Sequence, residues 1–156
     1  MSPEEFEDLV IAGIQRLGYK VQKIGNTNGR DGGIDFIACP ESAAHPYILA
    51  GQVKHSHTGK PVGSGDVRDF RGAIAPLPIN IAMLITNTRF TADAIWAAKQ
   101  RPSLIKLRDL EDLRLWLEGQ VEVEDLWDEI PDTLELAPGV TVQVPKPLAE
   151  KSRKAE

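Results

Sequence analysis

Three polar residues have types and spacing suited to metal-assisted hydrolysis of a phosphate ester. Asp35 offers a carboxylate, Gln52 a carboxamide oxygen and Lys54 an ammonium group. Gln52 and Lys54 are two positions apart, a spacing that places both side chains on one face of a strand. A hard cation such as Mg²⁺ takes a few oxygen ligands and keeps several waters. A lysine beside it can help deprotonate an attacking water or neutralise charge that develops on the phosphate.

The hydrophobic pattern predicts the elements that must position these residues. A helix over residues 3–17 is expected, with Ser2 as N-cap and Glu5 closing a capping box. Asp35 is expected inside the second strand, and Gln52 and Lys54 near the end of the third. The predicted order is αβββαβαβα, an α/β fold. Strands are expected at 19–24, 34–39, 47–54, 79–85 and 104–107, and further helices follow residues 64, 91 and 109.

Side-chain chemistry predicts how the later helices begin and what they bury. Ser64, Thr91 and Asp109 are the expected N-caps. Trp96 and Trp116 occupy apolar helical positions and are expected in the core.

Length and composition exclude several classes of protein. The chain has 156 residues, which fits one domain plus a tail. A single cysteine, Cys39, rules out an internal disulfide framework and is too little thiol for a structural zinc site. There is no apolar run near the roughly 20 residues needed to cross a bilayer, and no secretory signal is recognised. The expectation is a cytoplasmic protein without a membrane partner.

Charge is distributed unevenly along the chain. The net charge is −5, yet residues 61–108 carry seven Lys and Arg against three Asp and Glu, whereas residues 109–156 carry five against thirteen. Because binding to a phosphate backbone needs cations, the middle of the chain is the expected nucleic-acid contact. Residues 118–135 are expected to avoid DNA and to contact instead a partner subunit, a neighbouring protein or the basic face of the same domain.

Two segments together resemble a known family. The stretch Gly29-Arg30-Asp31-Gly32-Gly33-Ile34-Asp35-Phe36-Ile37-Ala38, followed by Gln52-Val53-Lys54, is similar to the Mrr-type catalytic domain of the restriction-endonuclease-like (PD-(D/E)xK) nuclease superfamily. The resemblance covers roughly residues 3–118. It implies an αβββαβ core with a mixed central sheet flanked by helices. It also implies a Mg²⁺-dependent DNA endonuclease, with Mn²⁺ as a possible substitute, that acts in restriction or genome defence. A homodimer is expected, because one active site cuts one strand.

The resemblance also implies roles for individual residues. Asp35 would be the metal-binding acid, and Gln52 a neutral variant of the usual Glu or Asp. Lys54 would be the catalytic lysine, the Val53 backbone carbonyl a further metal ligand, and Glu7 a carboxylate that reaches the metal through water. With Gln52 as a neutral donor, Gln52→Glu is expected to retain activity and to bind Mg²⁺ more tightly.

The remaining candidates keep alternative interpretations. The expected phosphate contacts are Arg68, Arg71, Arg89, His55, Lys60, Lys99 and Arg101. A solvated helix face explains Arg68 and Arg71 nearly as well. Asp31 could bind metal, although Asp in a glycine-rich turn more often bonds its own backbone. His55 and His57 could form a metal pair, but without a third ligand they are better read as loop residues beside DNA.

The sequence favours a nuclease domain over residues 1–118 followed by an acidic extension over residues 119–156. Two other functions stay open. One is a structure-selective repair or junction nuclease, which the same fold supports. The other is a catalytically weak DNA- or protein-binding module, because the amide of Gln52 brings no charge to a metal.

Overall fold

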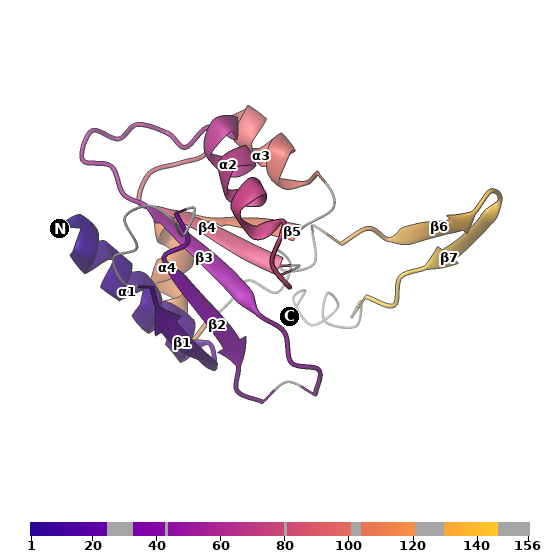
Figure 1. Cartoon of the computed structure of the whole chain (residues 1–156), viewed down its shortest axis with the longest axis horizontal. Coiled ribbons are helices and arrows are strands. Elements are labelled where there is room, and N and C mark those ends of the chain that lie inside the picture. Colours follow the sequence, from indigo (N-terminus) through magenta and orange to yellow (C-terminus); the bar gives the residue numbers. More distant parts are fainter. Residues whose placement is uncertain (25–32, 43, 80, 101–103, 121–129, 147–156) are drawn as a thin grey trace, which may run out of the picture. The chain divides into compact units, whose positions relative to one another are not determined.

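The computed structural model describes residues 1–24, 33–42, 44–79, 81–100, 104–120 and 130–146, and it divides into two units. In its described residues, the first unit, Met1–Gln120, holds a five-stranded sheet and four helices (Figure 1). The second, Val121–Glu156, holds a two-stranded hairpin.

The five strands lie in the order β1-β2-β3-β4-β5. β1 (Tyr19–Lys23), β2 (Phe36–Pro40) and β3 (Leu49–Lys54) form an antiparallel meander. β4 (Ile81–Thr86) and β5 (Leu104–Arg108) are each parallel to their neighbour. The mixed sheet flanked by helices confirms the predicted fold class.

Helices cover both faces of the sheet (Figure 1). α1 (Pro3–Arg16) and α4 (Leu110–Leu117) share one buried cluster, and α2 (Ser64–Ile74) and α3 (Ala92–Ala98) share the other. β4 divides its side chains between the two layers, as a buried central strand must. Its members of the α2–α3 cluster are Ala82 and Leu84, and those of the α1–α4 cluster are Met83 and Ile85.

The helix starts show which capping predictions hold. The Ser2 hydroxyl accepts a hydrogen bond from the Glu5 N–H at 3.1 Å, and Glu5 Oε2 accepts from the Ser2 N–H at 2.7 Å. Thr91 and Asp109 also cap their helices as predicted. The Ser64 cap is wrong: Ser64 is the first helical residue and Gly63 is the N-cap. The Gly63 N-cap is stabilised by Asp66, whose Oδ2 accepts a hydrogen bond from the Gly63 N–H at 3.3 Å.

Trp96 and Trp116 have opposite environments. Trp116 is 4% exposed and belongs to the α1–α4 cluster, as predicted. Trp96 is 64% exposed, so its predicted core position is wrong. Helical spacing places Trp96 on the outer side of α3, while Ala94, Ala97 and Ala98 form the buried side.

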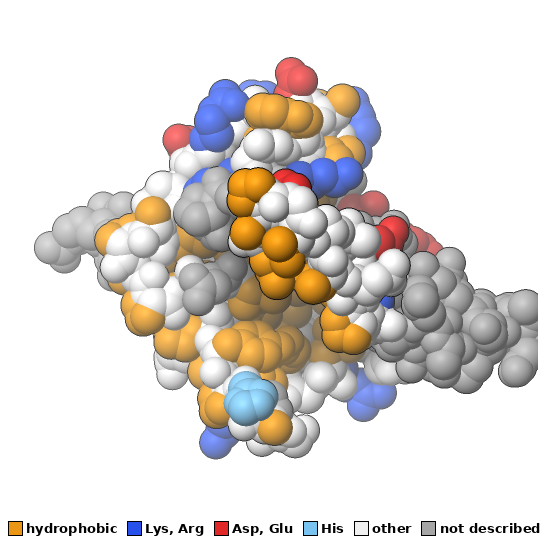
Figure 2. All heavy atoms as spheres, turned by 90° about the vertical axis from the view of Figure 1, so that its right-hand side faces the viewer, with side chains coloured by type: hydrophobic (Ala, Val, Ile, Leu, Met, Phe, Trp, Pro, Cys, Tyr) orange, Lys and Arg blue, Asp and Glu red, His pale blue; other side chains and the backbone are white. Residues whose placement is uncertain are grey.

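The second unit is a hairpin of β6 (Thr133–Ala137) and β7 (Val140–Gln143). It has four large apolar side chains that are 40–63% exposed: Leu134, Leu136, Val140 and Val142. Exposed hydrophobic side chains are visible on the side of the molecule drawn in Figure 2. Within the described ranges, no helix combines the length and apolar character that a bilayer crossing requires.

Candidate active site

Asp35 is held between β1 and β3. Its N–H donates to the Gly51 carbonyl at 2.8 Å, and its carbonyl accepts from the Ile24 N–H at 2.9 Å. Its Oδ2 accepts from the Val53 N–H at 2.7 Å. The predicted position inside the second strand is wrong by one residue, because β2 begins at Phe36. The pairing of β2 with β3 ends at Phe36 and Gly51, and beyond it the Asp35 carboxylate takes up the Val53 N–H.

The two ends of the Gln52 side-chain amide have different environments. The side chain is 6% exposed, and Nε2 donates to the Gly33 carbonyl at 2.9 Å. A backbone carbonyl only accepts, so this contact fixes the amide with its NH₂ toward Gly33. Oε1 is buried and has no hydrogen-bond partner among the described residues. A buried acceptor left unsatisfied costs about 1–3 kcal/mol, so this oxygen is suited to receive a ligand.

Two glycines make this arrangement sterically feasible. Gly33 has a φ of +85°, and a Cβ there would lie 2.2 Å from Gln52 Nε2. A Cβ on Gly51 would lie 2.0 Å from Cζ of Phe36, whose ring packs over that position. Gly33 lets the backbone carbonyl approach the Gln52 amide, and Gly51 lets Phe36 pair closely with β3 beside Asp35.

Lys54 ends β3 and lies opposite Thr86 of β4. Its Nζ lies 3.6 Å from Oδ1 of Asp66 in the first turn of α2, and both side chains are about 40% exposed. Strand alternation places Gln52 on the same face as Lys54. The sequence interpretation did not identify Asp66, although an acidic residue at the third position of a helix is itself a recognisable capping signal.

The donor set at Asp35 and Gln52 fits a hard divalent cation. One carboxylate and one neutral oxygen are provided by neighbouring chain segments, and such a cation completes its shell with water and substrate oxygens. Within the part of the chain that the structure describes, no cluster of three His, Cys, Asp or Glu side chains could hold a metal. Asp31 lies outside the described residues, and the predicted use of the Val53 carbonyl stays a prediction.

Glu7 lies on α1 beside the end of β1. Its side chain is 22% exposed, and Oε1 lies 3.5 Å from Lys23 Nζ. Lys23 also contacts Asp8 at 2.8 Å, and this hydrogen bond is the main cause of the raised pKa of the lysine. The residue after Lys23 is Ile24, which binds the Asp35 carbonyl. Glu7 therefore lies near the chain segment next to Asp35, and its water-mediated role stays a prediction.

The loop after β3 is tied to the loop after β4. Asn87 Oδ1 accepts from the Ser56 N–H and its Nδ2 donates to the Ser56 carbonyl, both at 2.9 Å. Arg89 Nη1 donates to the Gly59 carbonyl at 3.2 Å. Arg89 and Lys60 are both exposed. The paired loops thus present two of the predicted phosphate contacts on a braced surface, and sequence interpretation did not identify Asn87 as the brace.

The two histidines of this loop pack against each other. The ring centroids of His55 and His57 lie 4.6 Å apart, and His55 lies 5.6 Å from the ring of Phe6. His55 Nδ1 is buried without a hydrogen-bond partner among the described residues. No third metal ligand accompanies the pair in the described ranges, which favours their interpretation as loop residues.

The arginines of α2 have different environments. Arg68 is exposed on the surface of the helix. Arg71 donates to the carbonyls of Ala97, Ala98 and Gln100 at 2.7–3.2 Å. These contacts satisfy the carbonyls at the end of α3, and burial lowers the pKa of Arg71. We therefore assign Arg71 a structural role and leave it out of the proposed DNA contacts.

The other two predicted phosphate contacts lie at and beyond the end of α3. Lys99 is the exposed C-cap residue of this helix. Arg101 lies outside the described residues.

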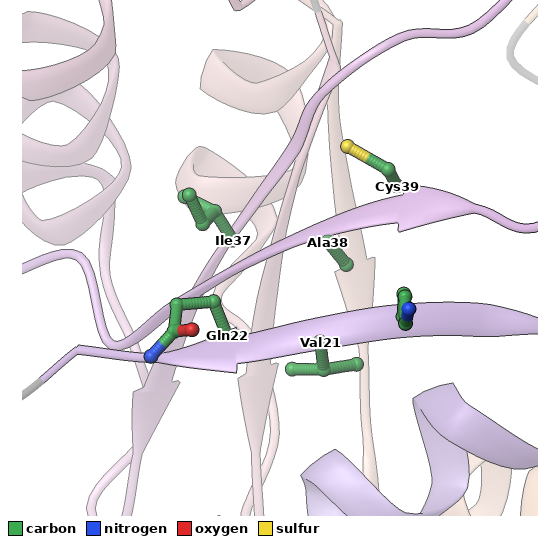
Figure 3. A pocket seen from close by; sticks show the side chains of 6 residues that line it. Val21, Gln22, Ile37, Ala38 and Cys39 are labelled. Carbon is green, nitrogen blue, oxygen red and sulfur yellow. The ribbon is translucent and has the colours of Figure 1, made fainter.

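A pocket of ≈ 320 Å³ lies away from this cluster, over the outer strands β1 and β2. Figure 3 shows Ile37 and Cys39 projecting from β2 on the same side of the sheet. Asp35, Gln52 and Lys54 are not among the residues that line this pocket.

Comparisons with known proteins identify relatives of the chain and structures with a similar fold. Over 136 residues the chain is 26% identical to the type IV methyl-directed restriction enzyme EcoKMrr of Escherichia coli (strain K12), covering 84% of this chain and 43% of that protein. The fold is similar to the DNA modification-dependent restriction endonuclease AspBHI, with a TM-score of 0.53, 17% identity and coverage of 74% of this chain and 31% of that chain.

It is also similar to the MspJI restriction endonuclease, solved with a 27-mer oligonucleotide, with a TM-score of 0.53 and 22% identity. That match covers 80% of this chain and 28% of the other. The chain thus spans less than half the length of each of these three proteins. The family model Mrr_cat, described as restriction endonuclease, matches residues 1–117. The chain therefore belongs to the Mrr-type restriction endonuclease family.

Proposed function

We propose that this chain is a Mg²⁺-dependent DNA endonuclease that hydrolyses phosphodiester bonds. The observation that carries the proposal is the set of contacts that hold the Asp35 carboxylate and the Gln52 amide in place. One carboxylate oxygen is fixed by the Val53 N–H, and the fixed Gln52 amide leaves a buried oxygen that has no hydrogen-bond partner among the described residues. Membership of a restriction endonuclease family supports the assignment of DNA as substrate.

Each residue of the cluster has a separate task in this proposal. Asp35 and Gln52 would hold the cation, which would polarise the scissile phosphate and activate a water. Lys54 would place its ammonium beside the attacking water and the developing negative charge. The backbone N–H of Val53 holds Asp35 in position, and the backbone carbonyl of Gly33 holds Gln52. Because these contacts use no solvent-exposed side chain, Asp35 and Gln52 are organised before substrate arrives.

The biological setting follows from the relatives by analogy. EcoKMrr is named as methyl-directed and AspBHI as modification-dependent. We propose that this chain also serves restriction or genome defence, with cleavage carried by residues 1–117. One active site cuts one strand, so cutting of both strands would use a homodimer. Sedimentation of the protein with and without a DNA duplex tests that stoichiometry.

A substrate screen tests the proposal. Plasmid, linear duplex and four-way-junction DNA are incubated with Mg²⁺, Mn²⁺ or EDTA, with methylated and unmethylated duplexes side by side. Cleavage of duplex DNA only when a divalent ion is present is the expected result. Cleavage confined to the junction would identify a repair-type nuclease, and binding without cleavage would identify a binding module. Cleavage in excess EDTA would refute the metal mechanism.

A further inference from the structure

We infer that Asp66 is the positioning residue of the proposed catalytic lysine. The inference rests on the proposed function. Asp66 Oδ1 lies 3.6 Å from Lys54 Nζ, while its Oδ2 accepts from the Gly63 N–H at 3.3 Å. One carboxylate therefore connects the start of α2 with the end of β3. No other residue of α2 forms an ion pair with Lys54 in the part of the chain that the structure describes.

The need for such a residue follows from the lysine itself. The Lys54 side chain has a flexible four-carbon stem and is 39% exposed, so neighbouring side chains leave its ammonium many positions. Asp35 and Gln52, in contrast, are fixed by backbone contacts at 2.7 and 2.9 Å. A flexible ammonium beside two fixed groups needs an anchor of its own, because a small misplacement of a reacting group lowers the rate strongly.

Asp66 has the properties of an anchor rather than of a stabilising ion pair. An ion pair between two side chains that are about 40% exposed contributes little to folding. Its carboxylate is itself held by the Gly63 N–H at the helix start. The position of Asp66 is therefore set by α2, and the ammonium of Lys54 follows it. The expected consequence of losing Asp66 is a slower chemical step with little change in DNA affinity.

Asp69 provides a matched control. It is an exposed aspartate on the same helix, so Asp69→Asn removes the same charge as Asp66→Asn. An asparagine at position 66 still offers an oxygen to the Gly63 N–H and so preserves the start of α2. Any general effect of one lost negative charge on DNA binding appears equally in both variants.

The first measurement does not depend on cleavage. In the full-length protein, the ¹Hε–¹³Cε NMR signal of Lys54 is assigned by its disappearance in Lys54→Arg. We expect Asp66→Asn to shift this signal and Asp69→Asn to leave it in place. An unchanged Lys54 signal in Asp66→Asn would overturn the inference, whatever the activity of the protein.

The second measurement is the single-turnover cleavage rate at saturating DNA and Mg²⁺. We expect Asp66→Asn to be at least ~10-fold slower with a DNA Kd within ~2-fold of wild type, and Asp66→Glu to recover most of the rate. Asp69→Asn should match wild type. Equal rates for the two asparagine variants would overturn the inference. Absence of cleavage by the wild-type protein would refute the proposed function instead, and the NMR comparison would still show whether Asp66 positions Lys54.

Discussion

Polar side chains are held in different ways in two regions of the molecule. One is the β2–β3 junction, formed by Asp35, Gln52 and Val53, and the other is the pair of loops after β3 and β4. At the junction, Asp35 and Gln52 are fixed by backbone groups at 2.7 and 2.9 Å, and Gln52 is 6% exposed. On the loops, Lys60 and Arg89 are exposed. Their braces, such as the pair of bonds from Asn87 to Ser56, act on the loop backbone.

The two regions are therefore expected to act on the substrate through different electrostatic effects. A buried oxygen in a fixed position can stabilise a charge at short range, and its effect falls off sharply when it is displaced. Exposed cations attract a phosphate backbone over about a Debye length and tolerate small movements. Changes at the junction should therefore alter the rate of cleavage, and changes on the loops should alter affinity and its dependence on salt.

The largest effect is expected from Asp35→Ala. Asp35 is the carboxylate of the proposed metal site, and metal assistance contributes several kcal/mol to such reactions, so the rate should fall by about 10³-fold or more. DNA binding should persist, because removing a carboxylate relieves repulsion of phosphate. Cleavage rates and gel-shift affinities measured on the same preparation test both statements. A fully active Asp35→Ala protein would exclude the mechanism.

A smaller loss of rate is expected from Gly33→Ala. The new Cβ would lie 2.2 Å from Gln52 Nε2, so the amide must move. Displacement of about 1 Å at a reacting group can cost about 10²-fold in rate.

Gly18→Ala is the control for Gly33→Ala, because Gly18 has a similar φ of +94° with nothing within 4 Å of its Cβ position. It shares the backbone strain without the clash. The two variants should lose similar stability in thermal denaturation, and only Gly33→Ala should be slow. Equal cleavage rates in the two would show that the Gln52 amide need not be held.

Gln52→Glu should have an intermediate outcome. From sequence alone, a carboxylate at this position is expected to retain activity and bind Mg²⁺ more tightly. The structure adds a cost, because Nε2 donates to the Gly33 carbonyl and a carboxylate would place an acceptor against an acceptor. A lost buried contact of this kind costs about 1–3 kcal/mol.

We therefore expect Gln52→Glu to bind Mg²⁺ more tightly but to cleave about tenfold more slowly. Gln52→Ala, which loses both ends of the amide, should be slower still. Rates followed across a Mg²⁺ titration separate the two effects. A Gln52→Ala protein with the wild-type rate would remove Gln52 from the site.

Local signals explain how much of the fold the sequence could predict. Ser2, Thr91 and Asp109 each place an acceptor at a helix start, and all three predicted caps are present. Ser64 carries the same signal, but the Asp66 carboxylate binds the Gly63 N–H and moves the start by one residue. Competition between two nearby caps is decided by side-chain geometry, which residue type does not specify.

The candidate site was predictable in its residue types but not in its contacts. The spacing of Gln52 and Lys54 and the glycines before Asp35 were sufficient to select them. The Val53 N–H bound to Asp35 joins residues 18 positions apart, and the Arg71 contacts with the end of α3 span 26 to 29 positions. Such tertiary contacts give Arg71 a structural role, where the sequence alone would place its side chain in solvent or on DNA. The exposure of Trp96 has a similar origin, since the tight packing of α3 uses its alanines.

A moderate effect on affinity is expected from the double variant Lys60→Ala with Arg89→Ala. Each phosphate contact contributes about 0.9 to the slope of log K against log salt. Losing both contacts should reduce that slope by about 1–2 while the rate at saturating DNA stays near wild type. Lys20→Ala is the control for the loss of one positive charge, because Lys20 lies on the outer strand β1. An unchanged salt slope in the double variant would place the DNA elsewhere.

The smallest effect on DNA binding is expected from removal of residues 121–156. Residues 1–120 contain 14 Lys and Arg and 14 Asp and Glu, so the net charge of −5 resides entirely in the removed part. Both buried clusters lie within the retained unit. The truncated protein should fold, and its DNA affinity should stay the same or increase because carboxylates that repel phosphate are gone.

Circular dichroism establishes folding of the truncated protein, and fluorescence anisotropy with a labelled duplex gives the affinity. The hairpin would then be a surface for a partner protein, since a two-stranded hairpin with exposed apolar side chains is only marginally stable by itself. A tenfold loss of affinity in the folded truncation would instead assign the extension to DNA binding.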